Sequence, residues 1–408
     1  MALIKCTECG HMVSDKAIEC PKCGCPIRKF EEADKPIESE IKDNLLFPQT
    51  DKPYRNTKII AYGGIVLLVA AIIGAYYWWQ YMGNNSKEEC YVPPVYSDNL
   101  VKLAQNGDVT AQSDLGVCYL NGYGISQNYE DAVKWFREAA EKGDARAICG
   151  LGVCYENGYG VSQDYVEAVK LYKKAAEKGF ARAICNLGVC YANGYGVSQD
   201  YEEAVRLLKK AAEKGDARAI SNLGLSYANG YGVSLDYEEA VRLFKKAAEK
   251  GDASAIGNLG DCYMDGYGVS QDYEEAVRLF KKAAEKGDAR AIGGLGICYI
   301  NGYGVSQNYE EAVKWFRKAA EKGDARAICG LGVCYENGYG VSQDYVEAVK
   351  LYKKAAEKGF ARAICCLGVC YANGYGVSRD HAEAVRLYKK AAEKGDVIAK
   401  KLLHDIDY

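Results

Sequence analysis

The chain has 408 residues, with 52 basic and 55 acidic residues and a formal net charge of -3. Charges of both signs are interspersed, which excludes the broad basic surface that neutralises a phosphate backbone, so the charge does not favour a nucleic-acid partner. All seven prolines precede residue 95, which leaves residues 95–408 free of the strongest helix breaker. This large C-terminal part is therefore predicted to be helical.

The first 27 residues contain two copies of the pattern Cys-x-x-Cys-Gly, separated by ten residues. Each copy lets two thiolates approach one ion, and the following glycine permits a tight turn. The stretch resembles the small zinc-ribbon family, and so short a segment needs the metal to fold. We therefore expect residues 1–27 to be a zinc ribbon that holds one structural Zn ion through Cys6, Cys9, Cys20 and Cys23.

Residues 28–57 mix charges and prolines with few apolar residues, which predicts a flexible linker. Residues 59–79 are mostly apolar and long enough to cross a hydrocarbon core of about 30 Å. We expect one transmembrane helix over residues 58–82, followed by a linker and the start of the helical array over residues 83–106. The helix starts too far from the N-terminus to be a cleaved signal peptide, so it is expected to remain as an anchor.

Charges beside the predicted span indicate its orientation. Lys52, Arg55 and Lys58 precede it, whereas Lys87 alone follows it closely, beside two glutamates. The positive-inside rule then places the N-terminus in the cytoplasm and the C-terminal part outside it, in a single-pass protein of the cell membrane. A four-thiolate zinc site also prefers a reducing compartment, but the many cysteines that follow the span are unusual outside the cytoplasm.

From residue 107 onward the sequence repeats with a period of 36. The period is visible in the glycines Gly107, Gly143, Gly179, Gly215, Gly251, Gly287, Gly323, Gly359 and Gly395. It gives eight full units over residues 107–394, and the remnant 395–408 is expected to form a C-terminal capping helix.

Each unit is predicted to be a pair of helices. In the unit 143–178, apolar and small residues at positions 148, 151, 152 and 155 form one stripe of a first helix, helix A, which ends at Gly158. Asp164 and Glu167 then form a capping box that starts a second helix, helix B, running to Lys178. Neither helix can bury its stripe alone, so successive hairpins must stack on one another.

The pattern A-x-x-x-L-G-x-x-Y-x-x-G-x-G-V-x-x-D-x-x-x-A-x-x-x-x-x-x-A-A-x-x-G runs through the eight units. It resembles the Sel-one-like repeats, relatives of the tetratricopeptide repeats with a longer loop between the helices. The expected fold class is all-α, an α/α superhelical solenoid of 36-residue helix-turn-helix repeats preceded by a small zinc ribbon and one transmembrane helix. The resemblance implies an adaptor or scaffold for protein complexes, without catalytic residues and without naming a partner.

The units differ at only a few helix A positions, which lie opposite the stripe of Leu151 on a helical wheel. Helix A lines the concave face in solenoids of this type, so a protein partner is expected there. The candidate contact residues are Cys149, Val153, Glu156, Ala192, Ala228, Met264, Ile300, Glu336 and Ala372. Neutral drift of solvent-exposed positions would produce the same pattern.

Seven units carry a cysteine at one helix A position, and the remaining unit has Ser226, so a small, partly buried side chain fits all eight. Equivalent cysteines in adjacent units would lie about 8–10 Å apart, beyond the reach of a disulfide. We therefore predict packed thiols. Cysteine-rich relatives of the resembled family carry disulfides between helices A and B, but helix B has no cysteine here, so that trait does not carry over.

Residues 139–185 are identical to residues 319–365, an offset of five units. Two distant stretches of helix A surface would then be chemically equal, which suits a repetitive or elongated ligand or two copies of one partner. Block duplication without a functional consequence explains the identity equally well.

These observations favour a membrane-anchored scaffold for protein interactions. The alternative is a transmembrane regulatory protein whose cytoplasmic zinc ribbon contacts a protein or nucleic acid while the repeats sense a ligand. An enzyme is not expected, because the three histidines are scattered along the chain and the glycine-rich loop recurs in every unit as a connector.

Overall fold

The computed structural model describes residues 3–5, 12–14 and 94–406. The chain divides into two units, Met1–Arg55 and Asn56–Tyr408. In the first unit, β1 (Leu3–Lys5) pairs antiparallel with β2 (Met12–Ser14). The predicted zinc ligands Cys6, Cys9, Cys20 and Cys23, the predicted linker 28–57 and the predicted span 58–82 lie outside the described residues.

Among the described helices, none combines the length and the apolar character that a membrane crossing requires.

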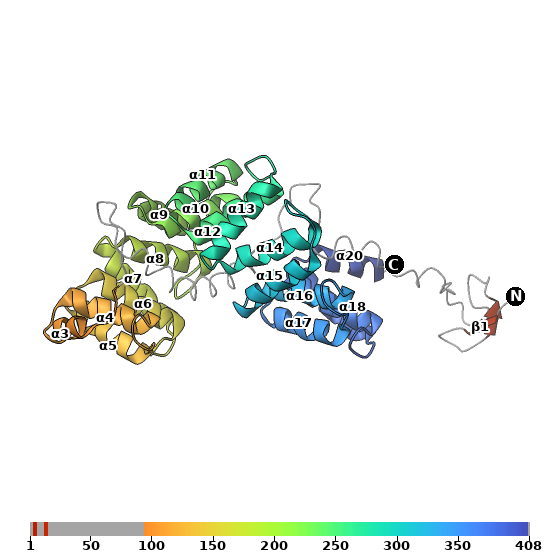
Figure 1. The fold of residues 1–408 in the computed structure, drawn as a ribbon, viewed down its shortest axis with the longest axis horizontal. Helices are drawn as coiled ribbons and strands as arrows, with labels where there is room; N and C mark the ends of the chain where they lie inside the picture. The colour runs from red at the N-terminus through yellow and green to blue at the C-terminus, as the bar shows by residue number, and fades with distance from the viewer. Residues whose placement is uncertain (1–2, 6–11, 15–93, 407–408) are drawn as a thin grey trace. The chain divides into compact units, whose positions relative to one another are not determined.

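The described part of the second unit contains eighteen helices that follow one another in chain order (Figure 1). The helix A segments are α4 (Val109–Asn121), α6 (Ala145–Asn157), α8 (Ala181–Asn193), α10 (Ala217–Asn229), α12 (Ala253–Asp265), α14 (Ala289–Asn301), α16 (Ala325–Asn337) and α18 (Ala361–Asn373). The helix B segments are α5 (Tyr129–Glu141), α7 (Tyr165–Glu177), α9 (Tyr201–Glu213), α11 (Tyr237–Glu249), α13 (Tyr273–Glu285), α15 (Tyr309–Glu321), α17 (Tyr345–Glu357) and α19 (His381–Glu393). The additional helices α3 (Asp98–Gln105) and α20 (Val397–Ile406) pack at the two ends of this series.

Local signals set the helix ends. Helix α6 begins after Asp144, whose carboxylate accepts a hydrogen bond from the Ala147 N–H at 2.6 Å, and ends before Gly158 in the left-handed conformation. Helix α7 begins after Asp164, as predicted.

The predicted capping box is only half formed. The Asp164 carboxylate accepts from the Glu167 N–H at 3.0 Å, but the Asp164 N–H donates to the Tyr155 carbonyl at 2.9 Å instead of to Glu167. The Glu167 carboxylate pairs with Lys170 at 2.9 Å. The return of the loop onto helix A thus satisfies the donor that a reciprocal box would have used.

The core of each hairpin forms where a helix B side chain covers a helix A glycine. In the second repeat the ring of Tyr172 lies over Gly152, where an added Cβ would be 2.7 Å from Tyr172 Cε1. The predicted stripe residues Ile148 and Leu151 are buried beside it. Aromatic rings dominate core energetics by their area, and those at the equivalent helix B position are also buried: Phe136, Phe244, Phe280, Phe316, Tyr352 and Tyr388.

Tyrosine pairs join each repeat to the next. The first residue of helix B stacks on the tyrosine of the following inter-helix loop, as in Tyr129 on Tyr159, with ring centroids 4.5 Å apart and planes at 8°. Six further pairs repeat this geometry: Tyr165–Tyr195, Tyr201–Tyr231, Tyr237–Tyr267, Tyr273–Tyr303, Tyr309–Tyr339 and Tyr345–Tyr375. The loop glycine after each stacked tyrosine has positive φ, +64° at Gly160, and touches the backbone of the preceding helix B. Only a residue without a Cβ fits this approach.

Candidate functional site

The helix A candidates for partner contact differ in their exposure. Partner contact at Cys149, Val153, Ile300 and Glu336 stays a prediction, although these four side chains are buried, at most 9% exposed. The physical reason for this burial is the side-by-side packing of neighbouring helix A segments. Asn186 of α8, for example, donates to the Cys149 sulfur of α6 at 3.7 Å.

The other five candidates are half-buried: Glu156, Ala192, Ala228, Met264 and Ala372. A half-buried position can contact a partner without leaving the fold, so partner contact at these positions stays a prediction.

Two of the candidates belong to acid–phenol pairs, one partly buried and one buried. The Tyr172 hydroxyl donates to Glu156 at 2.5 Å, and the Tyr352 hydroxyl donates to Glu336 at 2.6 Å. Burial raises the pKa of Glu156, and burial together with the Glu156 carboxylate raises the pKa of Tyr172. Sequence reasoning missed these pairs, although glutamate occurs at this helix A position only in the two repeats whose helix B continues Leu-Tyr after Val-Glu-Ala-Val-Lys.

In the middle of the array, the helix A side chains are more exposed than the four buried candidates. On α8, α10 and α12, which are neighbours along the array, the positions equivalent to Val153 and Glu156 are all half-buried. They carry four aliphatic side chains, one thioether and one carboxylate. We call this set the mid-array surface: Val189, Ala192, Leu225, Ala228, Asp261 and Met264. Its carboxylate, on Asp261, lies 3.6 Å from the Arg290 guanidinium.

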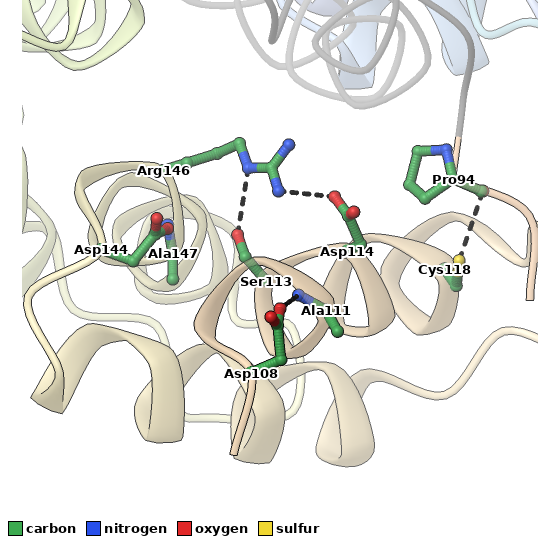
Figure 2. Close-up of polar contacts among 9 residues, drawn as sticks. All are labelled: Pro94, Asp108, Ala111, Ser113, Asp114, Cys118, Asp144, Arg146 and Ala147. Carbon is green, nitrogen blue, oxygen red and sulfur yellow. Dashed lines mark hydrogen bonds and ion pairs between the residues drawn. The ribbon is translucent and has the colours of Figure 1, made fainter. Parts of the chain in front are cut away.

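Arginines at the second residue of helix A join neighbouring repeats. In Figure 2, Arg146 of α6 reaches α4, where it donates to Ser113 Oγ at 3.1 Å and to Asp114 Oδ1 at 2.5 Å. Arg182 of α8 instead pairs with Asp216, the N-cap residue of the following helix α10, at 3.0 Å, and both side chains are buried. Removal of one partner from such a pair would leave a buried charge without compensation, so these contacts fix the placement of each repeat on the next.

The twelve cysteines of the described array are all free and buried, as predicted for packed thiols. Burial raises the pKa of the Cys154 thiol to about 12. The thiolate is the nucleophilic and metal-binding form, so a thiol of this kind is unreactive at neutral pH. Across the described ranges, no three His, Cys, Asp or Glu side chains are grouped so that they could hold a metal ion.

Known proteins give a consistent picture of the array. Sel1 repeats match eight consecutive segments: 109–144, 145–180, 181–216, 217–252, 253–288, 289–324, 325–360 and 361–396. Among solved structures, c5321, a protective antigen present in uropathogenic Escherichia coli strains and displaying an SLR fold, is 36% identical. That match covers 76% of this chain and 67% of that chain, with a TM-score of 0.47.

A Sel1 repeat protein from Oxalobacter formigenes is 27% identical, and the match covers 90% of this chain and 99% of that chain, with a TM-score of 0.48. No curated protein matches the chain significantly. The eight matched segments are contiguous and span residues 109–396, which is well over half of the sequence. The chain therefore belongs to the Sel1 repeat family.

Proposed function

We propose that the chain is a membrane-anchored scaffold that holds a partner protein on the helix A side of its Sel1 repeats. Arrays of stacked helical hairpins serve as extended binding surfaces, and Sel1 repeat solenoids are typical protein-interaction scaffolds. The observation that carries the proposal is the mid-array surface. The glycines, aromatic rings and tyrosine pairs are used for packing within and between the repeats. These six side chains are instead half-buried, and the side chains at these positions vary among the repeats.

The chemistry of the mid-array surface suggests the kind of partner. Val189, Leu225 and Met264 offer apolar contacts separated by the small residues Ala192 and Ala228, which leave room for a partner's side chains. Such apolar patches between neighbouring helices are where partner anchors dock. We therefore expect a partner segment that presents a row of apolar side chains.

The test is capture of the partner by full-length protein after crosslinking in native membranes. We expect Val189→Asp and Leu225→Asp each to reduce capture at least about tenfold, because a carboxylate replaces an apolar contact. Aspartate occurs naturally at the equivalent position, Asp261, so the fold should accept both changes. Lys209→Glu, on the exposed side of helix B, serves as the matched control and should capture normally.

Equal capture by all three variants would reject the mid-array surface, and failure to capture any partner at native expression levels would reject the scaffold itself.

Anchoring by residues 58–82 is the second part of the proposal. The apolar length and the flanking Lys52, Arg55 and Lys58 support one span with a cytoplasmic N-terminus and repeats outside. Deletion of residues 58–82 should release the protein from membranes that retain the intact chain after alkaline extraction. Labelling of repeat cysteines by an impermeant thiol reagent, after mild unfolding of exposed domains on intact cells, should succeed. Labelling only after membrane disruption would show that the repeats lie on the cytoplasmic side instead.

A structural zinc site at Cys6, Cys9, Cys20 and Cys23 is the third part. The pairing of Lys5 with Met12 supports it, because this pairing brackets the segment of chain that contains Cys6 and Cys9. We expect about one Zn per chain by elemental analysis of purified protein, and loss of most of that metal in Cys20→Ser. Partner capture that survives Cys20→Ser would favour the scaffold over the regulatory alternative, in which the ribbon transmits a signal.

A further inference from the structure

The repeated block described above continues past residue 185 after a single difference. Residues 139–198 and 319–378 are the same at every position except one, where the first block has Asn186 and the second has Cys366. The two positions lie on helix A of the third and eighth repeats. The two blocks therefore form a natural comparison of two side chains at one helix A position.

In the first block, the Asn186 amide links two neighbours. Its nitrogen donates to the Cys149 sulfur at 3.7 Å, and its oxygen accepts a hydrogen bond from Arg218. The second block lacks the cation, because the residue that corresponds to Arg218 is Ile398.

In the second block, the neighbour of Cys366 is another thiol. The Cys366 thiol on α18 lies within hydrogen-bonding reach of the Cys329 thiol on α16, and the two side chains are only 1% and 3% exposed. They are not equivalent positions of the repeat, since 37 residues separate them rather than 36. A comparison of equivalent cysteines alone overlooks this pair.

We propose that Cys329 and Cys366 form a reversible disulfide that fastens helix A of the eighth repeat to helix A of the seventh. The two thiols together lose two electrons and two protons as the sulfur–sulfur bond forms. The oxidant is a disulfide, either glutathione disulfide or an oxidised dithiol protein, which accepts both electrons and is reduced to two thiols. No other change in the covalent structure is needed.

The place of the pair in the array explains how a buried pair can react. The eighth repeat is the last of the matched repeats, and α20 is the last described helix after it. Terminal repeats of a solenoid open locally more readily than central ones. The Cys329 thiol and burial together hold the pKa of Cys366 well above its usual range, so oxidation proceeds through the opened form and is slow. Once the bond has formed, the same burial protects it from reduction.

The test uses reduced full-length protein carrying Cys149→Ser, incubated in mixtures of reduced and oxidised glutathione until its state no longer changes. The Cys149→Ser background is needed because tryptic peptides 147–170 and 327–350 are otherwise identical. Free thiols are then alkylated under denaturing conditions, and the digest is searched by mass spectrometry. We expect a disulfide between peptides 327–350 and 363–379, with fragmentation that places it on Cys329 and Cys366.

Two variants bracket this result. Cys366→Asn recreates the side chain of the first block, so it should fold normally and lack the crosslink. Asn186→Cys, with Cys149 restored, should gain a second crosslink between residues 149 and 186. In the parent protein, oxidation should slow amide hydrogen exchange in α18 on the order of a hundredfold, and Cys366→Asn should abolish that change.

Complete alkylation of both cysteines at the most oxidising ratio would overturn the proposal, as would pairing of Cys366 with Cys365 or any other residue.

Discussion

Asp252 and Asp216 occupy the same place in consecutive repeats but differ in their charge partners. Each caps a helix A by accepting a backbone N–H, and each is buried. Asp216 is paired with Arg182, whereas the corresponding Arg218 is hydrogen-bonded to Asn186. Burial consequently raises the pKa of Asp252 to about 6, although Arg182 and Arg218 oppose the shift. Because the Arg218 guanidinium is bonded to Asn186, the Asp252 carboxylate has no ion pair like that of Asp216, and its ionisation at neutral pH is unfavourable in the folded state.

This carboxyl predicts how stability depends on pH. Its pKa is about 6 when folded and 3.8 in the free chain, so the folded state binds the proton more tightly. The contribution of Asp252 to stability is therefore fully present below the unfolded pKa and is lost as pH rises through about 6, a fall of about 3 kcal/mol. Asp252→Asn keeps the cap and removes the titration. Chemical denaturation from about pH 4 to pH 7 should show a smaller fall in the unfolding free energy for this variant.

The exposed cap Asp164 provides the control for that experiment, since Asp164→Asn makes the same substitution at a solvated helix cap. Parallel curves for the parent and Asp252→Asn would contradict the assignment.

At the residue scale, the sequence predicted some environments and missed others for one reason. Burial of Ile148 and Leu151 follows from contacts within a single helical hairpin, and the stripe of apolar residues in the sequence predicts those contacts. Burial of Cys149 depends on Asn186 in the next repeat, and a helical wheel drawn for one helix contains no information about that neighbour. A wheel for one helix also hid the bond between Glu156 and Tyr172, because that bond joins the two helices of one hairpin.

At the scale of the helices, the joints between repeats depend on glycines that have different duties. Gly232 and Gly215 both have positive φ, +67° and +85°. An added Cβ at Gly232 would collide with the backbone carbonyl of Tyr201, whereas at Gly215 the nearest atom would be Lys250 Nζ at 3.8 Å, the end of a flexible side chain. Gly232 therefore permits both the left-handed backbone conformation and the close approach to Tyr201. Gly215 permits only the left-handed conformation.

This difference predicts the outcome of a matched pair of substitutions. Gly215→Ala should cost about 1 kcal/mol of unfolding free energy, the usual cost of a left-handed residue with a side chain. Gly232→Ala should cost about 2 kcal/mol more, because the joint to the preceding repeat must also shift. Chemical denaturation followed by circular dichroism measures both. Equal losses for the two variants would show that the approach to Tyr201 does not limit the joint.

Helix boundaries were predictable because their signals are local, as Asp164 before α7 and Gly158 after α6 illustrate. The reciprocal half of the capping box was not, because it requires knowing where the loop returns. That return brings the Tyr155 carbonyl to the Asp164 N–H, and Glu167 is then left for Lys170.

At the scale of the whole array, each joint uses the same contacts, so a complete unit should be removable. Deletion of residues 217–252 brings the third repeat against the fifth, where Tyr201 can stack on Tyr267 and Gly268 can take the place of Gly232. We expect a cooperatively folded array with seven repeats and a proportionate loss of ellipticity and stability. Deletion of residues 217–234 alone, which removes a helix A without its partner, should unfold the neighbouring repeats. Similar melting curves for both deletions would contradict a modular array.

The period of 36 was sufficient to predict this architecture, because every unit repeats the same capping and glycine signals. The identity of the partner was not predictable, since near-copies of one hairpin carry information only where they differ. The zinc ribbon and the membrane span rest on spacing and hydropathy and stay predictions.

Within the described repeats, the series of stacked tyrosines ends before the last helix B. The position that begins helix B with tyrosine in the other repeats is occupied by the exposed His381 in the last. At the other end, the loop glycine Gly124 meets Val95 and Tyr96 of the chain's own preceding segment. A tyrosine at residue 381 would offer the docking platform that each loop recognises, and one molecule could then continue into another. We expect the imidazole at residue 381 to deny an incoming copy that platform and so to disfavour end-to-end joining of molecules through this contact.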